Sequence, residues 1–352
     1  MNYFYLRPKN KSLLFIEDKI ARDAVINNIL ALRASLDKEI PDKKLTGNLV
    51  LGTWNIREFG NTKYNGRMTE SLYYIAEIIS RFDLIAIQEV RTDMAEFNQM
   101  LNILGEDYGV HVSIVTQGKS GNSERLAFLY DKRTVSFKNI AGQVILPKTT
   151  KQQDQFARAP YVIRFQSGWI KFDIATVHIY YGDDVKSGAK YKKRVEEIGQ
   201  IVKYFSDFYI NDKGKNEADN MFILGDFNIE DTKSDTYKAA TSARFAIPDS
   251  ILNGNLPGSN QLQTKIYDQI LYYSKYNNIK FSAAGVYNLY DTVFNDFSQY
   301  QERIEAHYGK KLAKKDFTDF RSYQMSDHLP LWIEMKTDLA DSYLEYIKKS
   351  AQ

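Results

Sequence analysis

Cysteine is absent from this chain of 352 residues. Its absence excludes disulfide bonds, thiolate metal ligands and a cysteine nucleophile. Any metal site must therefore be built from carboxylate, amide or imidazole groups. Such ligands suit hard ions such as magnesium, calcium or manganese.

Long apolar runs are missing as well. The early run over residues 13–16 is followed at once by Glu17, Asp18 and Lys19, so it is too short for a signal-peptide core or a membrane helix. We therefore expect a cytoplasmic protein with no membrane partner, and secretion without a recognisable signal peptide is the alternative. The formal net charge of +3 does not by itself indicate a nucleic-acid partner.

The chain is long enough to bury a substantial core without cross-links. Apolar residues recur at helical spacing over 13–39, and Leu14, Ile20 and Leu36 belong to this stripe. Pro41 then breaks the pattern. We expect an N-terminal helical extension over residues 1–46, a main domain over 47–337 and a C-terminal helix over 338–352.

Within the main domain, apolar or alternating segments predict strands, and segments with helical periodicity lie between some of them. The expected strands are 49–54, 84–87, 110–115, 125–130, 135–140, 161–165, 170–177, 221–224, 267–272, 281–284 and 331–335. The expected helices are 69–82, 94–105, 189–209 and 339–348, and the charged stretch 295–325 is interpreted as an insertion. Several strands follow one another directly, which favours antiparallel pairing. The predicted fold is an α/β, four-layer sandwich: two mixed, mainly antiparallel β-sheets packed face to face, with helices outside.

Polar residues cluster where the expected strands end. Loops at strand ends do not have to pack in the core, so open α/β sheets form their binding and catalytic sites there. Any one of these residues alone is more typical of a turn or a cap. The residues concerned are Asn55, Glu89, His178, Asp226, Asn228, Asp268, Asp327 and His328.

This set suits the hydrolysis of a phosphate ester, which needs charge neutralisation, an activated water and help for the leaving oxygen. Carboxylates such as Glu89 and Asp327 can hold a hard cation against phosphate oxygens. Asparagine side chains add neutral amide ligands. Histidines can move protons, provided that each has an orienting partner, and Glu124 and Asp268 are candidates for that task.

Taken in order, these motifs resemble the endonuclease/exonuclease/phosphatase superfamily, and in particular its deoxyribonuclease I-like members. The resemblance covers roughly residues 48 to 336. The segments that carry it are TWNIREFG (53–60), DLIAIQEVR (83–91), SERLAFLYD (123–131), FARAPYVIRF (156–165), ATVHIYYG (175–182), ILGDFNIE (223–230), YDQILY (267–272) and SDHLPLWIEM (326–335).

The resemblance implies a role for each matching residue. It implies a metal centre at Asn55, Glu89 and Asp327. It implies that Asp226 and Asn228 position the phosphate and the attacking water, or hold a second metal. His178 and His328 match the two catalytic histidines, and Glu124 and Asp268 match their acidic partners. Either Asp226 or a histidine is the base within the family.

Two arginines bear on the substrate. Arg91 and Arg158 match basic positions that face the DNA backbone or minor groove in the deoxyribonuclease-like branch, and the alternative for each is a surface salt bridge. We therefore predict a divalent-metal-dependent phosphodiesterase, an endonuclease on DNA, with Mg²⁺ as cofactor and Mn²⁺ or Ca²⁺ as alternatives. The alternative hypotheses are a phosphatase or phospholipid phosphodiesterase of the same fold, an RNA-directed nuclease, an abasic-site endonuclease, or a scaffold without catalysis.

Overall fold

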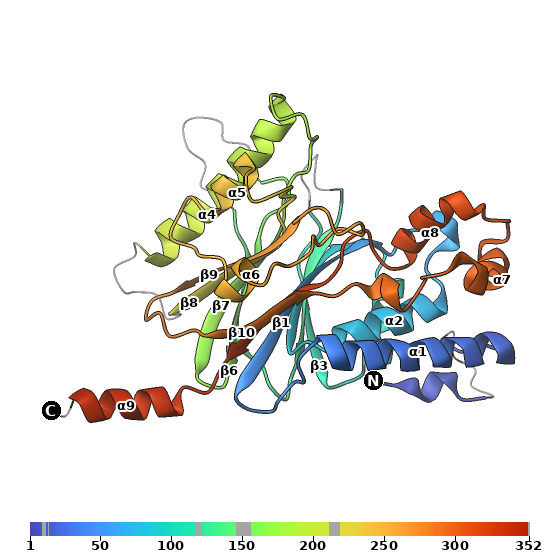
Figure 1. Cartoon of the computed structure of the whole chain (residues 1–352), viewed down its shortest axis with the longest axis horizontal. Coiled ribbons are helices and arrows are strands. Elements are labelled where there is room, and N and C mark those ends of the chain that lie inside the picture. Colours follow the sequence, from blue (N-terminus) through green and yellow to red (C-terminus); the bar gives the residue numbers. More distant parts are fainter. Residues whose placement is uncertain (9–11, 13, 117–121, 146–155, 211–218, 351–352) are drawn as a thin grey trace.

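The computed structural model describes the chain except for residues 9–11, 13, 117–121, 146–155, 211–218 and 351–352 (Figure 1). The polar composition of residues 116–123 and 147–158 predicts loops, and most of both stretches lies outside the described residues. None of the described helices is long and apolar enough to span a membrane.

Two β-sheets form the centre of the molecule. The six-stranded sheet contains β1 (Asn48–Phe59), β2 (Leu84–Val90), β3 (Tyr108–Val112), β4 (Arg125–Asp131), β10 (Phe281–Val286) and β11 (Leu331–Lys336), in the order β10-β11-β1-β2-β4-β3. The five-stranded sheet contains β5 (Ser136–Gln143), β6 (Tyr161–Ser167), β7 (Ile170–His178), β8 (Asn220–Asp226) and β9 (Asp268–Ser274), in the order β5-β6-β7-β8-β9. Only the β1–β2 and β7–β8 pairs are parallel among these strands.

Side chains alternate between the two faces of each strand, and this alternation builds the core. Leu49 and Leu51 of β1 point to the other sheet, where they join Phe222 and Leu224 of β8 in one buried cluster. The intervening Val50 belongs to a different cluster, on the outer face of the six-stranded sheet. The two sheets therefore pack face to face through a shared apolar layer.

Helices cover both outer faces. On the six-stranded sheet lie α1 (Lys19–Glu39), α2 (Thr69–Ile79) and α3 (Ala95–Leu104), and on the five-stranded sheet lie α4 (Ala189–Ile210) and α5 (Asp235–Ala240) (Figure 1). The shorter elements are η1 (Tyr3–Leu6), η2 (Lys63–Asn65), α6 (Asp249–Leu252), η3 (Leu289–Asp291) and η4 (Lys314–Asp316). The C-terminal α9 (Ala340–Ser350) extends away from the body (Figure 1). The predicted four-layer α/β sandwich is confirmed.

The first helix begins later than its apolar spacing predicted. Asp18 is its N-cap, and the Asp18 carboxylate accepts a hydrogen bond from the Ala21 backbone N–H at 2.6 Å. Ile20 was expected in the apolar stripe but is 81% exposed, whereas Arg22 in the same turn is buried. Leu32 and Leu36 are fully buried and share a cluster with α2.

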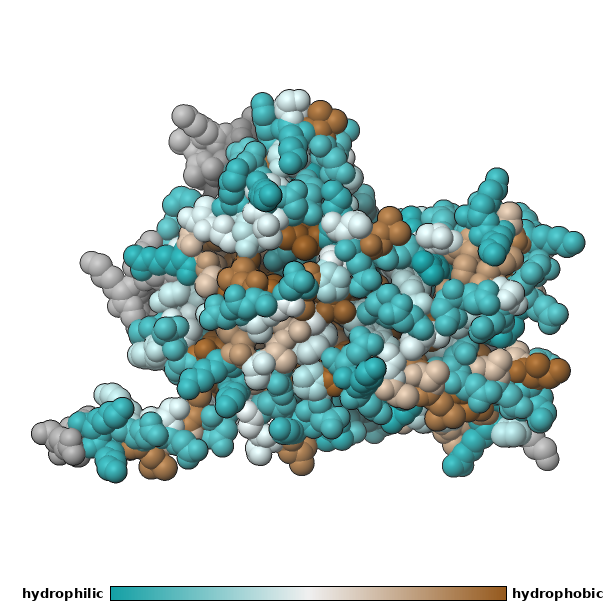
Figure 2. Space-filling view, viewed as in Figure 1, coloured by the Kyte–Doolittle hydropathy of each residue, from teal (hydrophilic) through white to brown (hydrophobic). Residues whose placement is uncertain are grey.

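The charged stretch 295–325 forms two packed helices, α7 (Phe297–Tyr308) and α8 (Phe317–Gln324), with η4 between them. Tyr300, Ile304 and Phe320 are buried in the cluster that α2 also joins. Figure 1 shows α7 and α8 together at one end of the molecule, on the opposite side from α4. In Figure 2 most side chains on the visible face are hydrophilic, with small apolar patches over α6 and along α1.

Candidate active site

Three predicted site residues meet through strand register. His178 is the last residue of β7 and is the register partner of Asp226, the last residue of β8. Asp226 is in turn the partner of Asp268, the first residue of β9. Register partners project from the same face of a sheet, so these three side chains lie side by side at one edge. Asp268, expected inside a strand, begins it.

The six-stranded sheet contributes Asn55 and Glu89 from two neighbouring parallel strands. Asn55 does not follow β1, as the sequence suggested, but lies within it, because β1 continues to Phe59 across an irregularity in its pairing with β2. Such bulges re-aim side chains and are frequent beside active sites. Glu89 has a φ of +63°, a left-handed conformation that non-glycine residues rarely adopt. The Glu58 backbone N–H donates to Glu89 Oε2 at 2.9 Å and helps to hold it there.

The turn that carries Asp327 and His328 is fastened to β1. The Ser326 hydroxyl donates to the Asn55 carbonyl at 2.6 Å and accepts from the His328 backbone N–H at 3.0 Å. The indole N–H of Trp54 donates to the His328 carbonyl at 2.9 Å. These bonds to β1 of the six-stranded sheet place His328 beside Asp226 and Asp268 of the five-stranded sheet.

His328 is held by a buried carboxylate. Its Nδ1 lies 2.8 Å from Asp268 Oδ2, which also accepts from the Ser259 hydroxyl at 2.7 Å. Its Nε2 lies 3.6 Å from Asp226 Oδ2. Burial alone would lower the pKa of His328, but the charges of Asp268, Asp226 and Asp327 outweigh it, and the pKa lies well above 6.5.

His178 has a similar carboxylate partner but a different electrostatic environment. Its Nδ1 lies 3.0 Å from Glu124 Oε1, and its Nε2 lies 3.6 Å from Asp226 Oδ2. The Arg158 guanidinium is in close contact with the same Glu124 carboxylate. Burial and the charge of Arg158 lower the pKa of His178 to about 4, although Asp226 and Glu89 oppose that shift. At neutral pH His178 is therefore neutral while His328 is protonated.

Asn228 is held in place by hydrogen bonds to the Asp226 side chain and to the Ile179 backbone. Its N–H donates to Asp226 Oδ1 at 2.8 Å, and its side-chain amide donates to the Ile179 carbonyl at 2.9 Å. Its φ is +52°. Both bonds hold the Asn228 side chain within the same cavity as Asp226.

Asn55 and Glu89 fit a hard cation. The Asn55 side-chain amide donates to Glu89 Oε1 and to Asp226 Oδ2, both at 3.0 Å, and this fixes the position of its Oδ1. That oxygen is buried and has no hydrogen-bond partner among the described residues. Burial raises the pKa of Glu89, but His178, Asn55 and the Glu58 N–H outweigh burial and lower it to about 2, so Glu89 is ionised. An orphaned amide oxygen beside an ionised carboxylate is the donor set that Mg²⁺ or Ca²⁺ prefers.

The third predicted metal ligand, Asp327, stands nearer the solvent. Its side chain is 45% exposed, and its Oδ2 lies 3.7 Å from the Nε of Arg57. Asp327 nevertheless lines the same cavity of about 440 Å³ as Glu89, Asp226 and both histidines. Two further groupings of acidic and histidine side chains also have metal-ligand spacing, namely Glu89 with Glu124 and His178, and Asp226 with Asp268 and His328.

The two arginines predicted to contact substrate occupy different places. Arg158 is only 5% exposed, lines the cavity and donates to the His178 carbonyl at 3.4 Å, so a surface salt bridge does not describe it. Arg91 lies outside the cavity lining, where it pairs with Glu58 at 2.7 Å and donates to the Asn122 carbonyl at 2.6 Å. Its surface pairing matches the alternative stated for it.

Four residues that sequence reasoning did not single out also belong to this region. Tyr180, Tyr181 and Tyr267 line the cavity, and the Tyr267 ring lies 5.5 Å from that of His328. Arg57 reaches Asp327 from β1. The signal for Arg57 was its position two residues after Asn55, because alternate residues of a strand share a face.

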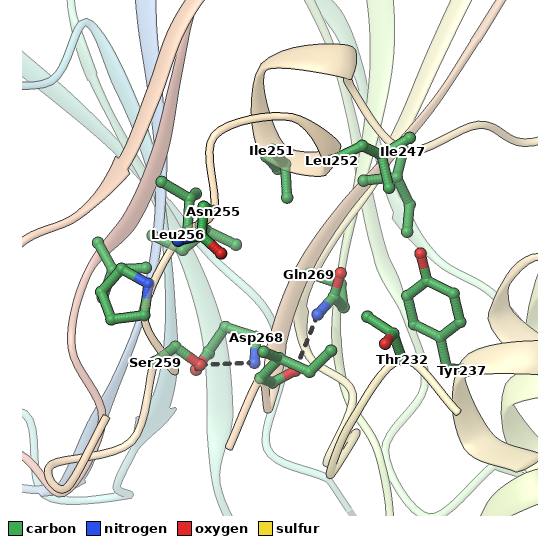
Figure 3. Close-up of a pocket in the computed structure, with 14 residues that line it drawn as sticks. Thr232, Tyr237, Ile247, Ile251, Leu252, Asn255, Leu256, Ser259, Asp268 and Gln269 are labelled. Atoms are coloured by element: carbon green, nitrogen blue, oxygen red, sulfur yellow. Dashed lines mark hydrogen bonds between the residues drawn. The ribbon is translucent and has the colours of Figure 1, made fainter. Parts of the chain in front are cut away.

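A second cavity, of about 220 Å³, lies on the other side of Asp268 (Figure 3). Its wall is largely apolar and includes Ile247, Ile251 and Leu256. The Asp268 backbone N–H donates to the Ser259 hydroxyl at 3.0 Å at its base (Figure 3). The side chain of Asp268 is fully buried between the two cavities and is directed to His328.

Known proteins resemble the chain in sequence and in fold. It is 28% identical to Deoxyribonuclease-1 of Bos taurus over 217 residues, which are 58% of this chain and 71% of that protein. It is 24% identical to Deoxyribonuclease-1-like 2 of Mus musculus over 82% of this chain and 92% of that protein. The crystal structure of D. rerio TDP2 complexed with single strand DNA product matches with a TM-score of 0.52 and 11% identity, over 82% of this chain and 98% of that one.

The model of the Endonuclease/Exonuclease/phosphatase family matches residues 52–298, a range that includes most of β1 and all of β2 to β10. The deoxyribonuclease I-like resemblance seen in the sequence is therefore confirmed. The match, the sheet topology and the site geometry lead to one conclusion: the chain belongs to the Endonuclease/Exonuclease/phosphatase family and is a hydrolase of phosphodiester bonds.

Proposed function

We propose that the protein is a divalent-metal-dependent endonuclease that hydrolyses phosphodiester bonds in DNA. One observation carries the proposal: Asp226 Oδ2 lies 3.6 Å from the Nε2 atoms of both His178 and His328, in one cavity. The curated relatives named deoxyribonucleases support DNA as the substrate.

In this proposal Asn55, Glu89 and Asp327 hold Mg²⁺, with Mn²⁺ as a substitute. When bound, the cation would neutralise charge on the phosphate oxygens and favour deprotonation of the attacking water. The buried, unpaired Oδ1 of Asn55 supports this assignment, because it lies beside the ionised Glu89 carboxylate, where a bound cation would satisfy it.

Protons are handled by the two histidines. Neutral His178 accepts a proton at Nε2, and protonated His328 donates one from Nε2 to the leaving oxygen. Glu124 and Asp268 orient the two rings through their Nδ1 atoms. A pair of groups whose environments push their pKa values apart is the arrangement expected of an acid and a base.

The remaining residues position the substrate. Asp226 and Asn228 hold the water and phosphate between the histidines, since both line the cavity and are bonded to each other. Arg158 faces the phosphate from the cavity wall, and Arg91 contacts the flanking backbone. We further propose that residues 47–337 form the catalytic domain, to which the 1–46 helical extension and the 338–352 C-terminal helix are added.

Nicking of supercoiled plasmid by the purified full-length protein tests the function. With Mg²⁺ or Mn²⁺ the plasmid should relax, and EDTA should stop the reaction. His178→Ala and His328→Ala should each abolish nicking while the circular dichroism spectrum stays that of the wild type.

Alternative substrates make the test decisive. Inositol phosphates and bis(p-nitrophenyl) phosphate are assayed beside plasmid DNA and single-stranded RNA. If both nucleic acids survive while one of the small esters is hydrolysed, the protein is a phosphatase or a general phosphodiesterase and the nuclease proposal fails.

A further inference from the structure

The α7–η4–α8 region carries a group of four lysines outside the lining of the active-site cavity. Lys310, Lys311, Lys314 and Lys315 lie within six residues between α7 and α8, and all four are exposed. None of them forms an ion pair within the described part of the chain. Asp316 is the only acidic residue over 309–316, so this tip is strongly positive.

A cation–aromatic bridge connects this tip to the cavity. Arg57, whose Nε lies 3.7 Å from Asp327, stacks on Tyr323 of α8 with its guanidinium carbon 3.8 Å from the ring centroid. Lys63 Nζ lies 4.2 Å from the same centroid. The Tyr64 ring contacts both Tyr323 and Tyr308, at centroid distances of 5.9 Å and 5.2 Å, and Tyr308 is the last residue of α7 before the lysines.

The bridge is fixed to the core. The Gln324 side chain accepts from the Met68 N–H at 2.7 Å and from the Ser71 hydroxyl at 2.9 Å. A His307 ring nitrogen lies 3.0 Å from the Gly66 carbonyl. A binding surface that is already ordered loses little entropy when a partner binds.

We propose that this cationic tip and its Tyr323 bridge form a second contact surface for nucleic-acid backbone phosphates beyond the scissile bond. The inference rests on the proposed nuclease function. Four unpaired lysines on a rigid support match a polyanion of regular charge spacing, whereas a small phosphate ester in the cavity would not reach them. The ring of Tyr323 is half-buried, and the two cations that flank it, Arg57 and Lys63, both pair with Asp319, so this bridge holds α8 beside Asp327 while the lysines supply the phosphate contacts.

The test replaces all four lysines by glutamine in the full-length protein. With Mg²⁺ present, we expect kcat/KM on a 40-base-pair duplex to fall at least about tenfold, because each lost phosphate contact weakens the electrostatic part of binding. The negative slope of log(kcat/KM) against log salt should become shallower by about 2 to 4, at roughly 0.9 per contact. Turnover of bis(p-nitrophenyl) phosphate should stay within twofold of the wild type.

A matched control variant loses four positive charges at the strand ends that lie away from the active site. Lys132, Lys171, Lys280 and Lys336 are exposed and lie near strand ends remote from Asn55, His178 and Asp226. Their quadruple glutamine variant should change kcat/KM on the duplex less than threefold. If the two variants behave alike while the wild type cleaves DNA, the second contact surface is refuted. If the wild type hydrolyses only the small ester, the proposed function itself has failed.

Discussion

Replacing Asp268 by asparagine tests how His328 is kept protonated. The change preserves the size of the side chain and removes its charge. At an effective dielectric constant of about 20, two unit charges 2.8 Å apart attract each other by about 6 kcal/mol. Asp226, at 3.6 Å from Nε2, retains part of that attraction. We therefore expect a rate loss of about 10²- to 10⁴-fold, equivalent to roughly 3–5 kcal/mol of transition-state stabilisation.

Single-turnover plasmid nicking at saturating Mg²⁺ measures this loss directly. The alkaline limb of the pH–rate profile should move to lower pH in Asp268→Asn, because the pKa of His328 falls when the carboxylate charge is removed. Ser259→Ala is the control: its hydroxyl accepts from the Asp268 backbone N–H and donates to the Asp268 carboxylate at 2.7 Å, and only the second bond bears on the charge pair. That variant should lose less than about tenfold, in line with one hydrogen bond of about 1 kcal/mol.

Stability provides an independent readout of the same charge pair. The folded pKa of His328 is raised above the unfolded value, so its contribution to stability is complete below about pH 6.5 and is lost as pH rises through the folded pKa. Urea unfolding in EDTA should show the wild type losing free energy of unfolding on the alkaline side, and Asp268→Asn losing less. An Asp268→Asn enzyme within threefold of wild-type rate, with the same pH dependence of stability, would refute the reasoning.

Three further changes are each expected to affect one feature. Leu32→Ala leaves a cavity at a fully buried position of α1 and should lower the free energy of unfolding in urea by about 2–5 kcal/mol. Ile20→Ala, at an exposed position of the same helix, should lower it by under about 0.5 kcal/mol. Equal effects would show that α1 does not pack as described. Asn55→Ala should raise the Mg²⁺ concentration for half-maximal nicking at least about tenfold, and an unchanged midpoint would remove Asn55 from the metal site. Arg158→Met removes a cation that lowers the pKa of His178, so the acidic limb of the pH–rate profile should move to higher pH; a profile that stays in place would contradict that cause.

Sequence pattern was enough to predict the sheets and most of their strands. Apolar runs and period-2 alternation are local properties, and the residues at the ends of β7 and β8 were recognised because polar side chains follow an apolar run abruptly. The start of α1 was missed although Asp18, directly before Lys19, has the chemistry of an N-cap. That cap was the available local signal.

Other parts of the site could not be predicted from local pattern. The register that aligns His178, Asp226 and Asp268 depends on pairing between strands distant in sequence. The irregularity that places Asn55 within β1 depends on β2. A sequence also does not show which partner an arginine will have, and this is why the burial of Arg158 against Glu124 was not predicted.

The site is nearly symmetric about Asp226, and one arginine breaks that symmetry. Each histidine presents Nε2 to the same oxygen at 3.6 Å and has a buried carboxylate at Nδ1. Geometry alone would therefore give the two rings the same protonation. Arg158 contacts Glu124, the carboxylate beside His178. Among the described residues, no arginine or lysine pairs with Asp268, the carboxylate beside His328. Because Arg158 is buried, bulk salt screens it weakly, so the salt dependence of the proposed DNA cleavage should arise mainly from exposed cations such as the lysines between α7 and α8.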